Sequence, residues 1–238
     1  MPEPMGGPMI VVLFDIDGTL LSTHGAGKRA LEAALVAHFG SAGPSEHRYD
    51  GKTDGQIARE LMRTAGFEDA VIDERMPSVL EHYLGGLDRE LAAAPPPRVY
   101  AGVRELLDAL ERRADVTIGL LTGNIEGGAR AKLAAANLGP QRFRLGAFGS
   151  DHERRDALPA IARARATALL EREIAGDALV IIGDTPHDIT CGRSIGARAI
   201  GVATGHYAAA ALAEHAPVAV FDDLSVTDRV IEAILRVS

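Results

Sequence analysis

The sequence predicts an α/β protein, with a Rossmann-like, doubly wound parallel sheet and a helical domain inserted after the first strand. Short apolar runs alternate along the chain with segments of helical periodicity, which is typical of a parallel sheet covered by helices on both faces. The runs show no regular alternation of apolar and polar residues, as expected of strands buried on both faces. After the first run this alternation stops for a long interval that holds only helical patterns. The interval predicts the inserted domain.

Six apolar runs predict the strands of the sheet, and each has the length of a strand. They span Met9–Phe14, Val116–Leu121, Leu145–Phe148, Ala178–Ile182, Ala199–Ala203 and Val218–Phe221. Most are rich in Val, Ile or Leu, and helical periodicity lies between them. The helical segments are Val103–Arg113, Glu126–Asn137, Ala157–Glu173, Asp188–Ile195 and Leu224–Arg236.

The interval after the first strand divides the chain into two predicted domains. It opens with the flexible stretch Ser22–Gly27 and closes at Pro95–Pro97, a stiff segment that cannot continue a helix. We therefore expect residues 1–21 and 97–238 to form the α/β core and residues 22–96 to form the helical domain. Its candidate helices are Ala26–Phe39, Asp54–Ala65 and Asp73–Ala94.

Composition and charge exclude several classes of protein. The chain has 25 basic and 33 acidic residues, and the net charge of −8 opposes nonspecific binding of nucleic acid. Aromatic residues make up 4% with no Trp, too few for a platform on which bases stack. No apolar run reaches the roughly 18 residues of a membrane span, and Met1–Pro8 lacks the pattern of a signal peptide. A single cysteine, Cys191, cannot form a disulfide within the chain, so we expect a cytoplasmic protein. We expect a monomer or homodimer without nucleic-acid or membrane partners.

Acidic residues directly follow two of the predicted strands. Asp15 and Asp17 end the first, and Asp184 and Asp188 follow the fourth. In an open parallel sheet, ligands bind beyond the carboxyl ends of the strands, near the point where the strand order reverses. Asp15 and Asp17 leave the same face of an extended segment, where unpaired carboxylates repel each other. A hard divalent cation would neutralise them, and Mg²⁺ keeps water ligands that a phosphate can replace.

These carboxylates also have structural interpretations. Asp17 with Gly18 could form a turn, an interpretation that the arrival of Asp184 at the same edge disfavours. Asp188 falls in the first turn of a helix, where it would stabilise the helix dipole. We therefore rank Asp184 as the metal ligand and Asp188 as a ligand or a supporting residue.

The segment Thr122-Gly123-Asn124 ends the second strand and opens a helix. A Thr or Asn at this position commonly caps the helix. Free backbone N–H groups at the same place, with the positive end of the helix dipole, would also bind an anion. Both interpretations can hold together at this edge of the sheet.

Together these motifs resemble those of the haloacid dehalogenase superfamily. They are Asp15-Ile-Asp17-Gly-Thr-Leu, the strand-end Thr122-Gly123-Asn124, and Gly183-Asp184-x-x-x-Asp188, in that order. The resemblance covers nearly the whole chain, since the helical insertion resembles the cap of the phosphoglycolate phosphatase and β-phosphoglucomutase branch. It is far more specific for the superfamily than for a substrate.

The resemblance implies a role for each motif in phosphoryl transfer. Asp15 would be the nucleophile that attacks phosphorus and forms an aspartyl-phosphate. Asp17 would protonate the leaving oxygen and then deprotonate the attacking water. Thr122, with the backbone around Gly123 and Asn124, would hold the phosphoryl oxygens. Mg²⁺ would be bound by the carboxylate of Asp15, the main-chain carbonyl of Asp17, and Asp184, with Asp188 assisting.

One residue of the family pattern is missing. The family normally has a Lys before the helix that follows the third strand, but the segment Gly149–Pro159 contains none. Arg155 is the best replacement and Arg154 the second, because a guanidinium forms bidentate hydrogen bonds with carboxylate and phosphate groups. The alternative is that both arginines belong to a solvated basic face of the helix.

Asp17 also favours one class of reaction within the superfamily. An acidic residue two positions after the nucleophile resembles the pattern of its phosphatases and phosphomutases and not that of its dehalogenases. We expect a Mg²⁺-dependent phosphatase for a small phosphomonoester, resembling phosphoglycolate or a sugar phosphate. The alternatives are a β-phosphoglucomutase-like mutase and, less favoured, a phospho-accepting signalling domain. In the Asp50–Gly55 loop we expect Lys52 to contact a carboxylate or second phosphate of the substrate, unless the loop is a plain turn capped by Thr53 or Asp54.

Overall fold

Six parallel strands form the central sheet of residues 9–236, the part of the chain that this computed structural model describes. They are β1 (Ile10–Phe14), β4 (Val116–Thr122), β5 (Leu145–Phe148), β6 (Leu179–Gly183), β7 (Arg198–Val202) and β8 (Ala219–Phe221). The strand order is β5-β4-β1-β6-β7-β8, so the predicted doubly wound parallel α/β fold is confirmed. The segment Met1–Pro8, on which we predict no signal peptide, lies outside the described residues.

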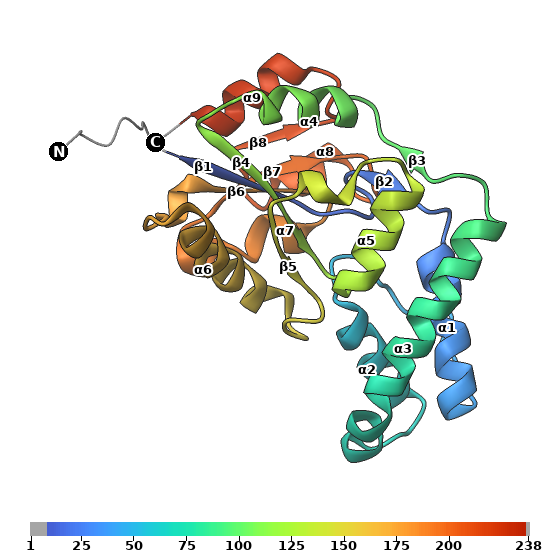
Figure 1. The fold of residues 1–238 in the computed structure, drawn as a ribbon. Helices are drawn as coiled ribbons and strands as arrows, with labels where there is room; N and C mark the ends of the chain where they lie inside the picture. The colour runs from blue at the N-terminus through green and yellow to red at the C-terminus, as the bar shows by residue number, and fades with distance from the viewer. Residues whose placement is uncertain (1–8, 237–238) are drawn as a thin grey trace.

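Helices cover both faces of this sheet (Figure 1). They are α4 (Val103–Glu111), α5 (Glu126–Ala135), α6 (Leu158–Leu170), α7 (Pro186–Thr190), α8 (Ala209–Ala213) and α9 (Thr227–Leu235). Because side chains alternate along a strand, Val12 and Phe14 of β1 pack in one apolar cluster with α4 and α9. Val11 and Leu13 point to the opposite face and pack with α6. Burial on both faces explains why the strands are apolar throughout.

The strand order places three strand ends side by side. From β1 the chain adds β4 and β5 on one side and then β6, β7 and β8 on the other. In register, Phe14 of β1 lies beside Leu120 of β4 and Ile182 of β6. The carboxyl ends of these three strands therefore meet where the strand order reverses, which is where open α/β sheets bind ligands.

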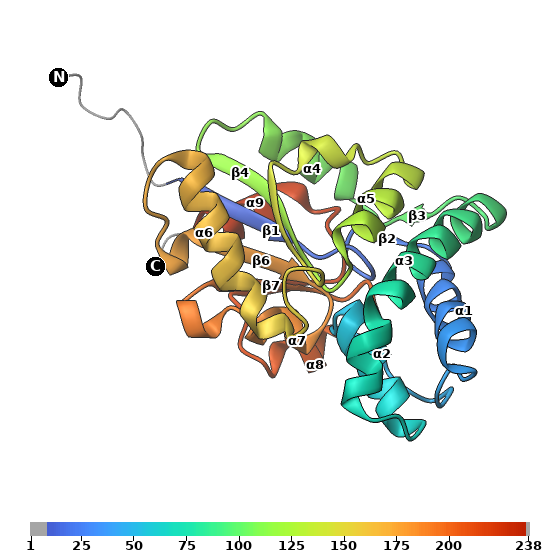
Figure 2. The same ribbon diagram turned by 60° about the horizontal axis from the view of Figure 1, so that its bottom comes forward.

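Helices α1 (Ala26–Phe39), α2 (Asp54–Thr64) and α3 (Asp69–Ala93) form a separate group, the α1–α3 unit, beside that edge (Figures 1 and 2). Leu35, Leu61 and Tyr83 of the unit are buried in an apolar cluster that also takes in Ile125 at the start of α5. The chain enters and leaves the unit through a short antiparallel pair, β2 (Leu21–Ser22) and β3 (Arg98–Val99).

Several boundaries differ from the sequence-based expectations. The pair β2–β3 and helix α8 were not predicted, because they are too short for a periodic pattern. Helix α3 begins at Asp69 rather than Asp73. The predicted helix Asp188–Ile195 is instead α7 followed by a 3₁₀ turn at Arg193–Ile195. Among the residues described, no helix combines the length and apolar character needed to span a membrane.

Candidate active site

The first motif lies at the end of β1, between the ends of β4 and β6. Asp15 is buried, whereas the side chain of Asp17 is 44% exposed toward the cavity. The chain turns sharply after them at Gly18, whose φ of 84° suits glycine. A Cβ on Gly18 would also overlap the carboxylate of Asp184, so the turn brings the first motif directly against β6.

Three buried carboxylates meet at this point. Oxygen atoms of Asp15, Asp184 and Asp188 all lie within 4.8 Å of one another. Burial raises the pKa of Asp15 to about 6, although the Arg155 guanidinium opposes the shift. Burial and the neighbouring carboxylates raise the pKa of Asp184 well above its ordinary value. One guanidinium does not balance three carboxylates, so this set of hard oxygen donors fits a divalent cation such as Mg²⁺.

Asp184 and Asp188 differ in what they bind within the protein. Asp184 accepts a hydrogen bond from the Thr19 hydroxyl at 2.9 Å on one oxygen, Oδ1. Asp188 uses both oxygens: Oδ1 accepts from Arg155, and Oδ2 accepts from the backbone N–H and hydroxyl of Thr185 at 3.0 and 2.7 Å. Asp188 therefore holds Arg155 and caps α7, while Asp184 Oδ2 has no hydrogen-bond partner among residues 9–236 and could bind a metal ion.

Of the two candidate arginines, the structure brings Arg155 to the carboxylates. Its guanidinium is 5% exposed and pairs with Asp188, and its Nη2 lies 3.4 Å from Asp15 Oδ2. Arg154 points to solvent with its side chain 73% exposed, 3.2 Å from Asp156. A rigid, buried guanidinium is where the family lysine was expected.

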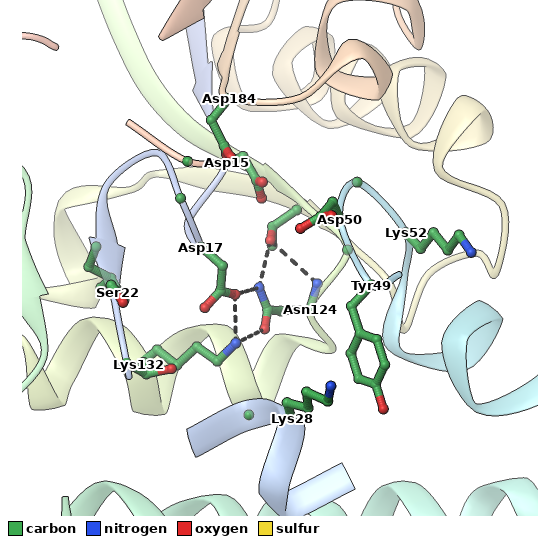
Figure 3. A pocket seen from close by; sticks show the side chains of 18 of the residues that line it. Asp15, Asp17, Ser22, Lys28, Tyr49, Asp50, Lys52, Asn124, Lys132 and Asp184 are labelled. Atoms are coloured by element: carbon green, nitrogen blue, oxygen red, sulfur yellow. Dashed lines mark hydrogen bonds and ion pairs between the residues drawn. The ribbon is translucent and has the colours of Figure 1, made fainter. Parts of the chain in front are cut away.

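The end of β4 forms the second wall of the site. The Asn124 amide donates to the Thr122 hydroxyl and to Asp17 Oδ2, both at 2.8 Å (Figure 3). Gly123 is required here, because a Cβ would overlap the main-chain oxygen of Lys52. The loop before α2 thus packs directly on this motif, and the Asp54 N–H donates to the Gly123 oxygen at 2.9 Å.

Asp54 extends this contact from the α1–α3 unit into the core. Its carboxylate accepts a hydrogen bond from the Ile125 N–H at 2.9 Å, while Thr53 caps α2 by accepting from the Gln56 N–H. Burial raises the pKa of Asp54 to about 6, and nearby Lys132 opposes the shift. Thr53 is therefore the cap that the sequence allowed, and Asp54 joins the two parts of the molecule.

The structure places the Lys52 side chain away from the carboxylates. Figure 3 shows it pointing away from Asp15, and its ammonium donates to Glu60 at 2.6 Å. Only the main chain of Lys52 approaches the motif at Gly123. Lys52 nevertheless lines the cavity, and so does Lys28 of α1 (Figure 3).

Sequence reasoning missed Lys132 of α5. Its side chain is 4% exposed, and its ammonium lies 2.6 Å from both Asp17 Oδ2 and Asn124 Oδ1. A signal was present, since Lys132 shares the buried face of the helix with Ala129 and Leu133. A buried lysine ammonium needs polar partners, and here those partners are Asp17 and Asn124.

A cavity of about 480 Å³ lies between the strand ends and the α1–α3 unit. Its core side carries the candidate catalytic groups, and the unit closes it from the opposite side with polar and aromatic side chains. Its lining includes Asp15, Asp17, Thr122, Asn124, Arg155 and Asp184 from the core, and Lys28, Tyr49 and Asp50 from the unit. Acidic and basic side chains from both parts of the molecule therefore face one cavity.

The comparisons agree with this class of site. The family described as haloacid dehalogenase-like hydrolase matches residues 9–196, so the chain belongs to this family of hydrolases, as the motifs predict. It is 27% identical over 223 residues to a 5'-nucleotidase of Pseudomonas aeruginosa, covering 93% of this chain and 95% of that protein. It is also 27% identical to "Probable phosphatase IndB" of Dickeya dadantii, covering 96% of each.

The fold is shared with solved structures. A structure described as a predicted phosphoglycolate phosphatase from Haemophilus somnus aligns with a TM-score of 0.69 at 18% identity. The alignment covers 94% of this chain and 98% of that one, so it includes the α1–α3 unit as well as the sheet.

Proposed function

We propose that the chain is a Mg²⁺-dependent phosphatase that hydrolyses a small phosphomonoester through an aspartyl-phosphate on Asp15. The proposal rests on one observation: the neighbouring carboxylates of Asp15 and Asp17 lie in different environments. Asp15 is buried beside Arg155 and Asp184, while Asp17 faces the cavity. Nucleophile and acid–base need these different surroundings. The two relatives described as a nucleotidase and a phosphatase support the same chemistry.

In the first step an Asp15 oxygen attacks the phosphorus of the ester. The bond from phosphorus to the ester oxygen breaks, and that oxygen takes a proton from the Asp17 carboxyl group and leaves as an alcohol. In the second step the Asp17 carboxylate takes a proton from water. The water oxygen attacks phosphorus, and inorganic phosphate leaves as the Asp15 carboxylate is restored.

Fixed positive groups stabilise the phosphoryl group during both steps. The Arg155 guanidinium is held by Asp188, and the backbone N–H of Gly123 would be a second donor at the end of β4. Asp15, Asp184 and the main-chain carbonyl of Asp17 would hold Mg²⁺, with Asp188 behind them. The ion would supply charge neutralisation for the carboxylates and the phosphoryl oxygens.

Residues 22–96 act in this proposal as a cap that excludes water and selects the leaving group. The cavity of about 480 Å³ is suited to a compact ester of the phosphoglycolate or sugar phosphate kind. Lys28 and Tyr49 of the cap lie where the leaving group would extend (Figure 3). The protein would act in the cytoplasm on this small molecule, without nucleic-acid or membrane partners, consistent with a net charge of −8.

The test is phosphate release from a panel of phosphomonoesters with Mg²⁺ and with a chelator. The panel contains phosphoglycolate, sugar phosphates and nucleoside monophosphates. We expect Mg²⁺-dependent release that is strongest for one compact ester. Absence of release from every ester would contradict the proposal, and phosphate retained on Asp15 in that case would favour the mutase.

A further inference from the structure

We infer that Lys132 is a positioning residue for Asp17: with Asn124, it fixes one carboxylate oxygen so that the other faces the leaving group. The inference rests on the proposed function and assigns a role to a residue that the motifs of the family do not include. Lys132 lies 115 residues after Asp17 in the chain. Only the fold brings them together.

Two hydrogen-bond donors hold one oxygen of the Asp17 carboxylate. Oδ2 accepts from the Lys132 ammonium at 2.6 Å and from the Asn124 amide at 2.8 Å. The two donors are themselves joined, because Lys132 also donates to Asn124 Oδ1 at 2.6 Å (Figure 3). Asn124 is in turn anchored on the Thr122 hydroxyl. Oδ2 is thus held from two sides, and Oδ1 has no protein partner among the described residues.

The Asp17 side chain needs these two hydrogen bonds because it lies at the exposed wall of the cavity. Its side chain is 44% exposed to the cavity, so packing alone does not fix its rotamer. A general acid must stay within hydrogen-bond reach of the leaving oxygen, and small displacements of a catalytic group cost large factors in rate. The donors on Oδ2 restrict the carboxyl group to one orientation.

A second observation is that the ammonium group of Lys132 lies at the interface between the core and the cap. Lys132 is buried although it belongs to a helix of the core, because α1 covers it at Gly27. A Cβ on Gly27 would lie 3.1 Å from the Lys132 ammonium nitrogen and 3.7 Å from the Tyr83 hydroxyl. The cap therefore covers the Lys132 side of its contact with Asp17, and the low exposure of the ammonium strengthens that contact.

A merely structural salt bridge and a positioning residue predict different kinetics. Proton donation to the leaving group matters much for an alkyl phosphate, whose alcohol is a poor leaving group, and little for 4-nitrophenyl phosphate. Loss of a structural contact lowers the amount or the stability of the enzyme and affects both esters equally. The quantity to compare is kcat/KM, because it reports the step in which the alcohol leaves.

The experiment measures kcat/KM for the best alkyl phosphate and for 4-nitrophenyl phosphate in the wild-type protein and in Lys132→Met. We expect a loss of about 100-fold with the alkyl ester and at least tenfold less loss with the aryl ester, the same pattern as in Asp17→Asn. In the Asp17→Asn background, Lys132→Met should cause no further selective loss. Arg130→Met is the matched control, since Arg130 lies on the same helix, is 58% exposed and pairs only with Glu126 among the described residues.

Equal losses on the two esters, or no loss, would overturn the inference while leaving the phosphatase proposal intact. A wild-type protein that hydrolyses neither ester would instead overturn the proposed function. If Lys132→Met does not fold, Lys132→Gln answers the same question, because its shorter amide keeps a polar group at the buried position. It should show the same selective loss for the alkyl ester.

Discussion

The guanidinium of Arg155 lies 3.4 Å from the carboxylate of Asp15 and is held there by Asp188. A guanidinium fixed in this way lies beside the carboxylate to which we assign the attack on phosphorus, where it would attract the substrate phosphate. In the proposed function, Arg155 takes the place of the family lysine and supplies its positive charge from a planar guanidinium.

The first prediction separates the two neighbouring arginines. Arg155→Ala should lower kcat by about 100-fold or more, because a preorganised positive group next to the phosphoryl oxygens is lost. Arg154→Ala should stay near wild type, since its exposed side chain contacts only Asp156 among the described residues. Steady-state kinetics of the two purified variants checks this. The reverse ranking would transfer the role to Arg154.

The second prediction concerns the two acidic residues after β6. Asp184→Asn should raise the Mg²⁺ concentration needed for half-maximal activity at least tenfold, because Asp184 keeps an oxygen free for the metal. Asp188→Asn should chiefly lower kcat, because both Asp188 oxygens serve Arg155 and Thr185. A Mg²⁺ titration of activity in each variant distinguishes them. Equal metal requirements in the two variants would contradict these assignments.

The third prediction is a pH dependence of stability that originates at Asp54. Burial raises the pKa of this carboxyl group to about 6, so the folded protein holds its proton more tightly than the unfolded chain does. Stability from Asp54 is therefore present below about pH 4 and is lost as the pH rises through about 6. Relative to Asp54→Asn, the wild type should lose about 2–3 kcal/mol of unfolding free energy across this range.

Urea unfolding of the two proteins between pH 4 and pH 7 measures that difference. Asp54→Asn is a suitable reference, since its amide oxygen can still accept the hydrogen bond from the Ile125 N–H. The other buried carboxylates titrate in both proteins and cancel. A difference in unfolding free energy that does not vary with pH would show that Asp54 does not titrate in this range.

The fourth prediction tests the contact between the cap loop and the core. Gly123→Ala should lower kcat/KM by at least tenfold, because the added methyl group overlaps the Lys52 main-chain oxygen and displaces the loop before α2. Gly85→Ala on α3 is the control, since the new methyl group meets no atom within 4 Å and alanine favours the helix. Wild-type kinetics for Gly123→Ala would show that this close approach has no role in activity.

Much of the fold could be predicted from the sequence because the strands carry their own signal. Runs such as Val116–Leu121 are apolar on both faces, and only a covered sheet hides both. The pair β2–β3 gave no such signal, because two residues cannot show a period. Its register depends on contact between Leu21 and Val99, which are far apart in the chain.

The site could be predicted only where residues follow strands. Asp15 and Asp184 could be placed together because parallel strand ends share one edge. The choice between Arg154 and Arg155 depends on which side chain turns inward, and neighbouring residues in an irregular segment give no period to decide it. The contact of Lys132 with Asp17 depends on how α5 packs against α3 and the end of β1, which no local pattern encodes.

The most direct test of the central claim is to look for the phosphoryl group on Asp15. Asp17→Asn, which lacks the base for the second step, is mixed with Mg²⁺ and 4-nitrophenyl phosphate, an ester whose leaving group needs little proton donation in the first step, then quenched in acid and digested for mass spectrometry. We expect the peptide that contains Asp15 to carry one phosphoryl group, and Asp15→Asn to carry none and to show no turnover. Normal turnover by Asp15→Asn would contradict the account.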